Sequence, residues 1–145
     1  MRQQGFTLLE VLVAMLIVSI GLVGLAGLMM TSVKNNQSAF YRSQASWLAY
    51  DVVDRMRANR TQALSGLYNI AYQVAPAGSG MPFTDLTQWK QELATALPGG
   101  DGQITFPNGV ATVQIKWDDS RGLGLSTNAN NAGNAPQFIT IQTQL

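Results

Sequence analysis

The chain begins with an apolar run that carries one charged residue. Residues 6–33 contain fifteen Leu, Ile, Val and Phe side chains and a single acid, Glu10. On the membrane-insertion scale these fifteen residues favour insertion by roughly 4.5 to 9 kcal/mol, whereas an acid at the bilayer centre costs roughly 2.5 to 3.5 kcal/mol. A helix over this run would be about 42 Å long, and the hydrocarbon core of a bilayer is about 30 Å thick. The pattern therefore predicts a membrane-spanning helix over residues 6–33.

A cleaved secretory signal peptide would be a different interpretation of the same run. Its apolar core is only about 7 to 15 residues long and ends at an Ala-x-Ala-like cleavage site. Here the run is longer and closes with Leu25-Ala26-Gly27-Leu28-Met29-Met30-Thr31. We therefore expect the apolar segment to remain in the mature protein.

Apolar residues keep a helical spacing beyond the span. No Pro or Gly occurs from Thr31 to Ala63. The residues that recur at spacings of three, four and seven are Tyr41, Ala45, Leu48, Val52, Met56 and Ala63. This pattern predicts one helix from Phe6 to about Ser65, in which residues 34–65 form an amphipathic continuation that is half-buried against a globular head.

The head is expected to span residues 66–145. The sequence of its first part predicts a loop followed by a short helix. Residues 66–83 are rich in Gly, Pro, Ala and Ser, which indicates an irregular loop pinned by aromatic residues. A helix is predicted near residues 85–97, with Thr84 or Asp85 as its cap and Pro98-Gly99-Gly100 as its stop. The aromatic residues of the loop are Tyr68, Tyr72 and Phe83, and the packed side of the helix consists of Leu86, Trp89, Leu93 and Leu97. For Trp89 a core position is favoured over a ligand site.

The period then changes from helical spacing to alternation. Strands are predicted near residues 103–106, 110–118 and 138–144, and Asn108-Gly109 between the first two is typical of a hairpin turn. Pairing across this turn would place Ile104 beside Val113 and Phe106 beside Ala111, with that face against the long helix. The predicted fold class is α+β, a long N-terminal helix packed on a small antiparallel sheet of three or four strands.

The Asn-rich connection from Ser120 to Pro136 follows two adjacent acids. The length and composition of the connection indicate a mobile surface loop. Asp118 and Asp119 could bind a hard cation together with Asn side chains of this loop, since oxygen ligands suit calcium. No calcium-loop spacing is present, so a turn at the strand end is the favoured interpretation. The sequence predicts neither a metal site nor a cofactor.

The N-terminal residues resemble the leader of a known family. Met1-Arg2-Gln3-Gln4-Gly5 followed by Phe6-Thr7-Leu8-Leu9-Glu10-Val11-Leu12-Val13-Ala14 is similar to the signal of type IV pilins and of type II secretion pseudopilins. The resemblance implies that residues 1–5 are a leader removed by a prepilin peptidase between Gly5 and Phe6. It also implies N-methylation of Phe6, a type IV pilin-like fold and an assembly role for Glu10.

Elementary electrostatics agrees with a role for Glu10 in assembly. Cleavage would leave an ammonium group on Phe6, and in a low-dielectric fibre core the carboxylate of one subunit would attract the amine of a neighbour. The alternative is that Glu10 only complements its own helix dipole, worth about 0.3 to 1 kcal/mol. Gly21, Gly24 and Gly27 suggest either pliability of the span or close helix packing, and the sequence leaves both open.

A second segment resembles the minor pilins of the PilV family. Residues 47–60, which include Ala49-Tyr50-Asp51 and Asp54-Arg55-Met56-Arg57-Ala58-Asn59, are similar to the helix segment of that family. The resemblance is looser around Leu97-Pro98-Gly99-Gly100 and Trp117-Asp118-Asp119. Arg55, Arg57 and Arg60 give this part of the helix local positive charge. They form either a solvated helix face, which is slightly favoured, or a docking patch for another minor pilin.

Composition bounds the function. The chain has no His and no Cys, which removes the commonest general base, the thiol nucleophile and disulfides. A net charge of +1 without a basic run argues against nucleic-acid binding.

We therefore expect a non-enzymatic assembly protein of the inner membrane, with a cytoplasmic N-terminus and a periplasmic head, that later enters the pilus fibre. The resemblance implies as partners the prepilin peptidase, other minor pilins, the major pilin, the inner-membrane assembly platform and a tip adhesin. The rival interpretation within the same family is a minor pseudopilin of a type II secretion system. A signal-anchored binding protein that never polymerises is the third alternative.

Overall fold

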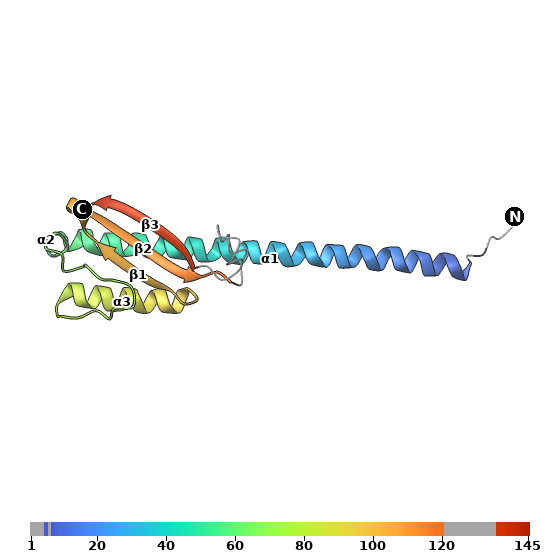
Figure 1. Ribbon diagram of the computed structural model, residues 1–145, viewed down its shortest axis with the longest axis horizontal. Coiled ribbons are helices and arrows are strands. Elements are labelled where there is room, and N and C mark those ends of the chain that lie inside the picture. The colour runs from blue at the N-terminus through green and yellow to red at the C-terminus, as the bar shows by residue number, and fades with distance from the viewer. Residues whose placement is uncertain (1–4, 6, 121–135) are drawn as a thin grey trace.

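The structure is a computed structural model that describes residues 5, 7–120 and 136–145 of the chain. Figure 1 shows one long helix whose second half carries a small head, while its first half extends away from the head toward the N-terminus. In the head, two helices lie side by side against one three-stranded sheet. Residues 1–4, Phe6 and 121–135, which include most of the predicted leader and of the Asn-rich connection, lie outside the described residues.

Helix α1 spans Leu8–Ala58 and contains both the apolar run and the first part of the head. From Leu8 to Asn36 every residue is exposed, whereas seven residues from Ser38 to Met56 are buried. The prediction of a single helix to Ser65 differs from the structure, because α1 ends at Ala58 and a separate helix α2 covers Arg60–Leu64.

The break at Asn59 has a tertiary cause. Its backbone N–H still bonds to the Arg55 carbonyl, but its φ of −114° and ψ of 38° leave the helical region. The Asn59 side chain donates a 3.3 Å hydrogen bond to the hydroxyl of Tyr68 in the following loop. Gly66, with a φ of 83°, then turns the chain after α2, as glycine does at low steric cost.

Helix α3 covers Met81–Ala96 and begins earlier than the sequence predicted. Gly80 occupies the cap position in place of Thr84 or Asp85, and Pro82 stands in the first turn, where a missing N–H needs no partner. Phe83 therefore belongs to the helix and not to the preceding loop. The predicted packed side is buried as expected, since Leu86, Trp89, Leu93 and Leu97 are each at most 4% exposed.

The sheet has the order β1-β2-β3 with antiparallel neighbours. Strand β1 covers Asp101–Thr105, β2 covers Val110–Asp118 and β3 covers Pro136–Gln144. The predicted α+β class is confirmed, with three strands among the described residues. Ile104 pairs with Val113 as predicted, and this face of β2 packs on α1.

Two details of the β1-β2 connection differ from the prediction. Phe106 lies outside β1, so its predicted pairing with Ala111 does not form. The connection is a short 3₁₀ turn, η1, over Pro107–Gly109, and not a two-residue hairpin turn. Proline fixes the backbone at the start of this turn, and Gly109 supplies a positive φ of 79° at its end.

The core is formed jointly by α1, α3 and the inner face of the sheet. The largest fully buried side chains are Trp89 of α3, Trp117 of β2 and Tyr68 of the loop. The Trp89 indole donates a 3.0 Å hydrogen bond to the Leu48 carbonyl oxygen, which joins α3 to α1. Because a head of this size has little interior of its own, the docked helix must contribute much of the buried apolar surface.

The loop from Ser65 to Gly80 is fixed against the edge of β1. Ile70 and Ile104 exchange backbone hydrogen bonds of 3.1 and 2.8 Å. Tyr68 is fully buried, as the prediction of aromatic pinning requires. Tyr72 lies under Lys116, whose Nζ is 4.5 Å from the ring centroid.

Candidate functional site

The first turn of α1 places the acid of the apolar run beside a capping residue. Thr7 has an extended backbone, with φ −80° and ψ 150°, and its hydroxyl oxygen accepts a 3.3 Å hydrogen bond from the Glu10 backbone N–H. Glu10 stands in the first turn, where a carboxylate complements the positive end of the helix dipole. The Thr7 cap was not predicted, although the spacing Thr-x-x-Glu is typical of a capping box.

The surface around Glu10 is open. Glu10 is exposed, and an apolar groove next to it is lined by Val11, Ala14, Met15 and Val18. The carboxylate is therefore accessible to a group from outside the chain. Phe6, the residue predicted to be cleaved and methylated, lies outside the described residues, so its geometry relative to Glu10 is not described. The neighbouring cleavage residue, Gly5, is exposed.

The three glycines of the span do not interrupt the helix. α1 continues through Gly21, Gly24 and Gly27, and a Cβ added at any of them would meet nothing within 4 Å. Within one chain these three positions are therefore exposed on the helix surface and have no neighbouring side chain. Both predicted roles, pliability and close packing with another helix, remain predictions.

The arginines predicted as a partner face do not act as one group. Arg55 forms an ion pair of 2.8 Å with Asp51 of its own helix, and it reaches α3, where it forms an ion pair of 3.3 Å with Glu92 and donates a 3.0 Å hydrogen bond to Gln88. Two carboxylates and an amide draw this guanidinium inward, so Arg55 holds the two helices of the head together.

The other two arginines of the predicted face stay at the surface. Arg57 is paired with Asp54 at 3.0 Å and also donates to Thr143 of β3 at 3.0 Å. Arg60 is exposed. The predicted solvated face therefore describes Arg57 and Arg60 better than Arg55.

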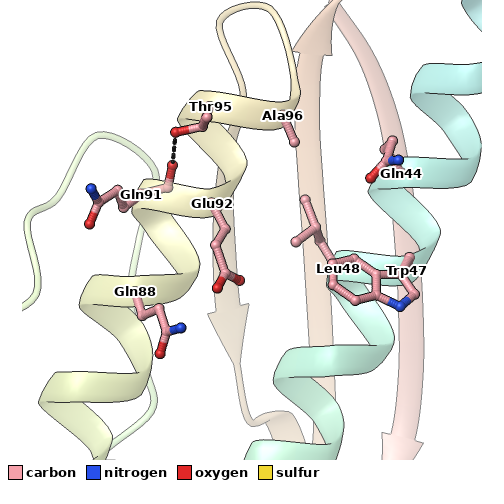
Figure 2. A pocket seen from close by; sticks show the side chains of 8 residues that line it. All are labelled: Gln44, Trp47, Leu48, Gln88, Gln91, Glu92, Thr95 and Ala96. Carbon is pink, nitrogen blue, oxygen red and sulfur yellow. Dashed lines mark hydrogen bonds between the residues drawn. The ribbon is translucent and has the colours of Figure 1, made fainter.

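A groove runs between α1 and α3 beside the Arg55–Glu92 ion pair (Figure 2). It has a volume of about 490 Å³, and α1 contributes Gln44, Trp47 and Leu48 to its wall. The α3 wall is formed mainly by glutamine, threonine and the ion-paired Glu92. Its only ionisable lining residue is thus already neutralised by Arg55.

The acids at the end of β2 have separate structural roles. Asp118 accepts hydrogen bonds from the Ser120 backbone N–H at 2.8 Å and from its hydroxyl at 3.1 Å, which is the predicted turn at the strand end. Asp119 is 1% exposed and accepts a 2.6 Å hydrogen bond from Ser38 of α1. In the described part of the chain, no cluster of three potential metal-ligating residues occurs.

A further charged contact fixes the loop before α3. Lys90 Nζ lies 2.6 Å from an Asp101 oxygen, and Asp101 also accepts from the backbone N–H groups of Gln73 and Gly102. Burial acts to raise the pKa of the Asp101 carboxyl, but the Lys90 and backbone donors outweigh it and hold that pKa below its ordinary value. This cluster is structural, because Lys90 and the two backbone N–H groups all bond to the Asp101 carboxylate.

Comparison with known proteins supports one class. Residues 1–26 match the family model of the prokaryotic N-terminal methylation motif. No curated protein and no solved structure gives a significant match to the chain. Within the described residues, α1 is the one helix long and apolar enough to cross a membrane, and its most apolar 18-residue window is wholly exposed. Together these findings support a membrane-anchored, type IV prepilin-like protein, in the class of pilins and pseudopilins.

Proposed function

We propose that this protein is a minor pilin of a type IV pilus, related to the PilV family. The observation that carries the proposal is the N-terminal methylation motif on a long helix whose apolar half is entirely exposed while its second half is built into a folded head. A helix of this kind needs lipid before assembly and needs other apolar helices in a fibre. The PilV assignment rests on the similarity of residues 47–60.

The proposed route begins with processing at the membrane. A prepilin peptidase cleaves between Gly5 and Phe6 on the cytoplasmic side of the inner membrane, and Phe6 is then N-methylated. The head stays in the periplasm until the subunit enters the fibre. The carboxylate of Glu10 then pairs with the Phe6 ammonium of a neighbouring subunit, which favours one axial register in the low-dielectric core.

The proposed role is structural and not enzymatic. Together with other minor pilins the subunit primes pilus assembly on the inner-membrane platform, and it is incorporated at the tip or in the fibre beside the major pilin. A tip adhesin is a further proposed partner. Support for this role comes from the anchored helix and from a head in which the described buried charges are engaged in internal contacts.

Processing and phenotype test the proposal in two steps. Mass spectrometry of the protein from membranes should find an N-terminal methylated Phe6, and shearing of cells should release the chain with the pili. Deletion should abolish surface pili and twitching motility while exoprotein secretion continues. The reverse phenotype would establish the minor pseudopilin alternative. An active, uncleaved chain that never enters fibres would refute both.

A further inference from the structure

The groove between α1 and α3 exposes a large aromatic side chain among neutral polar ones. Trp47 is 63% exposed, whereas the other two tryptophans of the chain, Trp89 and Trp117, are 0% and 2% exposed. Figure 2 shows the Trp47 ring extending from α1 toward α3, with Leu48 beside it. The groove therefore offers an indole ring to a ligand.

The ion pair beside the groove orients the polar groups of its α3 wall. Arg55 donates a 3.0 Å hydrogen bond to Gln88 Oε1, which leaves the amide nitrogen of Gln88 as a donor. Arg55 also donates to both carboxylate oxygens of Glu92 at 3.3 Å, and the remaining lone pairs of these oxygens can still accept. In Figure 2 both side chains reach from α3 toward α1. This wall thus presents an oriented donor and a charge-neutralised acceptor.

Three further neutral side chains complete the polar lining of the groove. Gln44 of α1 and Gln91 of α3 each carry an amide that can donate and accept. The Thr95 hydroxyl donates at 2.8 Å to the Gln91 carbonyl oxygen, so toward a ligand it acts as an acceptor. Such a set of groups matches a neutral ligand that is rich in hydroxyl groups.

We propose that this groove binds a neutral glycan through a short stretch of its pyranose rings. A pyranose ring has an apolar face of C–H groups, which stacks on an aromatic ring, and a rim of hydroxyl groups, each of which donates and accepts. The Trp47 indole fits the apolar face, and Gln88 and Glu92 fit neighbouring hydroxyls of the rim. This inference goes beyond the proposed function, because it holds equally for a pilin and for a pseudopilin.

Other classes of ligand fit the groove less well. An anion would meet the Glu92 carboxylate, whose cationic partner is already engaged. A purely apolar ligand would remove water from three glutamine amides without replacing their hydrogen bonds, which is unfavourable for each group. An extended peptide lacks the ring of hydroxyls and is the competing occupant in the experiment below. The volume of about 490 Å³ lies in the range of roughly 300 to 1,000 Å³ that small-ligand sites have.

Titration of the full-length chain with neutral oligosaccharides tests the site. The chain is kept in a detergent without a sugar headgroup, and the probes are the linear trimers of N-acetylglucosamine and of glucose. At least one trimer should give a saturable change in tryptophan fluorescence, because Trp47 is the exposed indole. Ligand-observed NMR should show the closest contact at C–H protons of a sugar ring. Binding of neither trimer, or of an uncharged peptide in their place, would overturn the proposal.

Variants locate the binding, and NMR follows them all because Trp47→Ala removes the fluorescent reporter. Trp47→Ala should weaken binding about tenfold, since the stacking face is lost, and Trp47→Phe should restore most of it. Gln88→Leu should weaken binding about threefold to tenfold. The matched controls are Tyr50→Ala, at a 58% exposed aromatic residue of α1 outside the groove, and Gln142→Leu, at an exposed amide of β3. Unchanged binding in Trp47→Ala, or an equal loss in the controls, would refute the site.

The same sugar chemistry has two sources, and sedimentation separates them. A periplasmic head lies beside the glycan strands of the cell wall, whereas other glycans occur on surfaces outside the cell. Co-sedimentation with purified peptidoglycan sacculi that is lost in Trp47→Ala and kept in Tyr50→Ala identifies the wall glycan. Trimer binding without sedimentation identifies a glycan outside the cell. Both results support the site, and neither depends on the presence of the chain in fibres, which tests the proposed function alone.

Discussion

The Ser38 hydroxyl donates a 2.6 Å hydrogen bond to Asp119 Oδ2 and so joins α1 to the end of β2. The two residues are only 9% and 1% exposed. The second carboxylate oxygen, Asp119 Oδ1, has no partner among the described residues. Since Ser38 is the first buried residue along α1, this bond holds the base of the head to the helix just beyond the span.

Replacing Ser38 should therefore loosen the head. Ser38→Ala removes a donor from a buried carboxylate, and we expect the free energy of unfolding to fall by about 2 kcal/mol. Urea unfolding of the detergent-solubilised chain, followed by tryptophan fluorescence, measures the change. Ser43→Ala, at an exposed serine of the same helix, should change it by no more than about 0.5 kcal/mol. Equal behaviour of the two variants would contradict a role for the bond.

Local patterns in the sequence predicted the register of β1 against β2 but did not predict the turn between them or such long-range contacts. Alternation predicted the pairing of Ile104 with Val113, because side-chain period and pairing register are linked in a strand. The Ser38–Asp119 bond joins residues 81 positions apart, and no pattern in the sequence links the two. The adjacent acids indicated only a turn or a cation site, and the buried serine that engages one of them could not be foreseen.

The end of the long helix was missed for the same kind of reason. Residues 58–64 are all acceptable in a helix, so propensity predicted continuation through Asn59. The break accompanies a contact with Tyr68 of the following loop, whose hydroxyl accepts a hydrogen bond from the Asn59 side chain. At the candidate site, the leader motif and Glu10 were visible in the sequence, but the inward turn of Arg55 depended on the position of α3.

Gly102 is a position where any side chain should be harmful. A Cβ there would clash with the Trp89 ring and would stand 2.9 Å from Leu93 Cδ1, so β1 and α3 pack too closely for a methyl group. Gly102→Ala should destabilise the head by about 1 to 3 kcal/mol, the usual effect of overpacking. Thermal unfolding compared with Thr105→Ala, at an exposed position of the same strand, provides the test. An unchanged melting temperature in Gly102→Ala would show that α3 can move away without loss.

The buried Tyr68 predicts a loss of stability at high pH. Burial and its hydrogen bond to Asp85 raise the pKa of Tyr68 to about 12, although the bond from Asn59 opposes them. The unfolded chain ionises this phenol near its ordinary pKa of 10.0, whereas the folded chain keeps the proton. The stabilisation is therefore complete below pH 10 and is lost as the pH rises toward 12.

Chemical unfolding at a series of pH values measures this effect. The free energy of unfolding should decline between about pH 10 and pH 12, and the decline should be smaller in Tyr68→Phe. Part of the decline should persist in Tyr68→Phe, because burial and the nearby Asp101 charge also raise the pKa of Tyr72. Between pH 7 and pH 9 the two proteins should show parallel profiles. An identical slope above pH 10 would rule out Tyr68 as its source.

Replacing Glu10 should impair assembly without impairing membrane insertion. Glu10→Ala should insert and be cleaved normally, because removing an acid makes the span more apolar. In a fibre it would leave a neighbour's Phe6 ammonium without a counter-ion, which costs about 3 kcal/mol, or roughly a hundredfold in incorporation. Immunoblots of sheared fibres and of membranes measure the two pools. Thr7→Ala removes the hydroxyl that accepts from the Glu10 backbone N–H but keeps the carboxylate. If Thr7→Ala reduced incorporation as strongly as Glu10→Ala, Glu10 would act through its own helix and not through a neighbour.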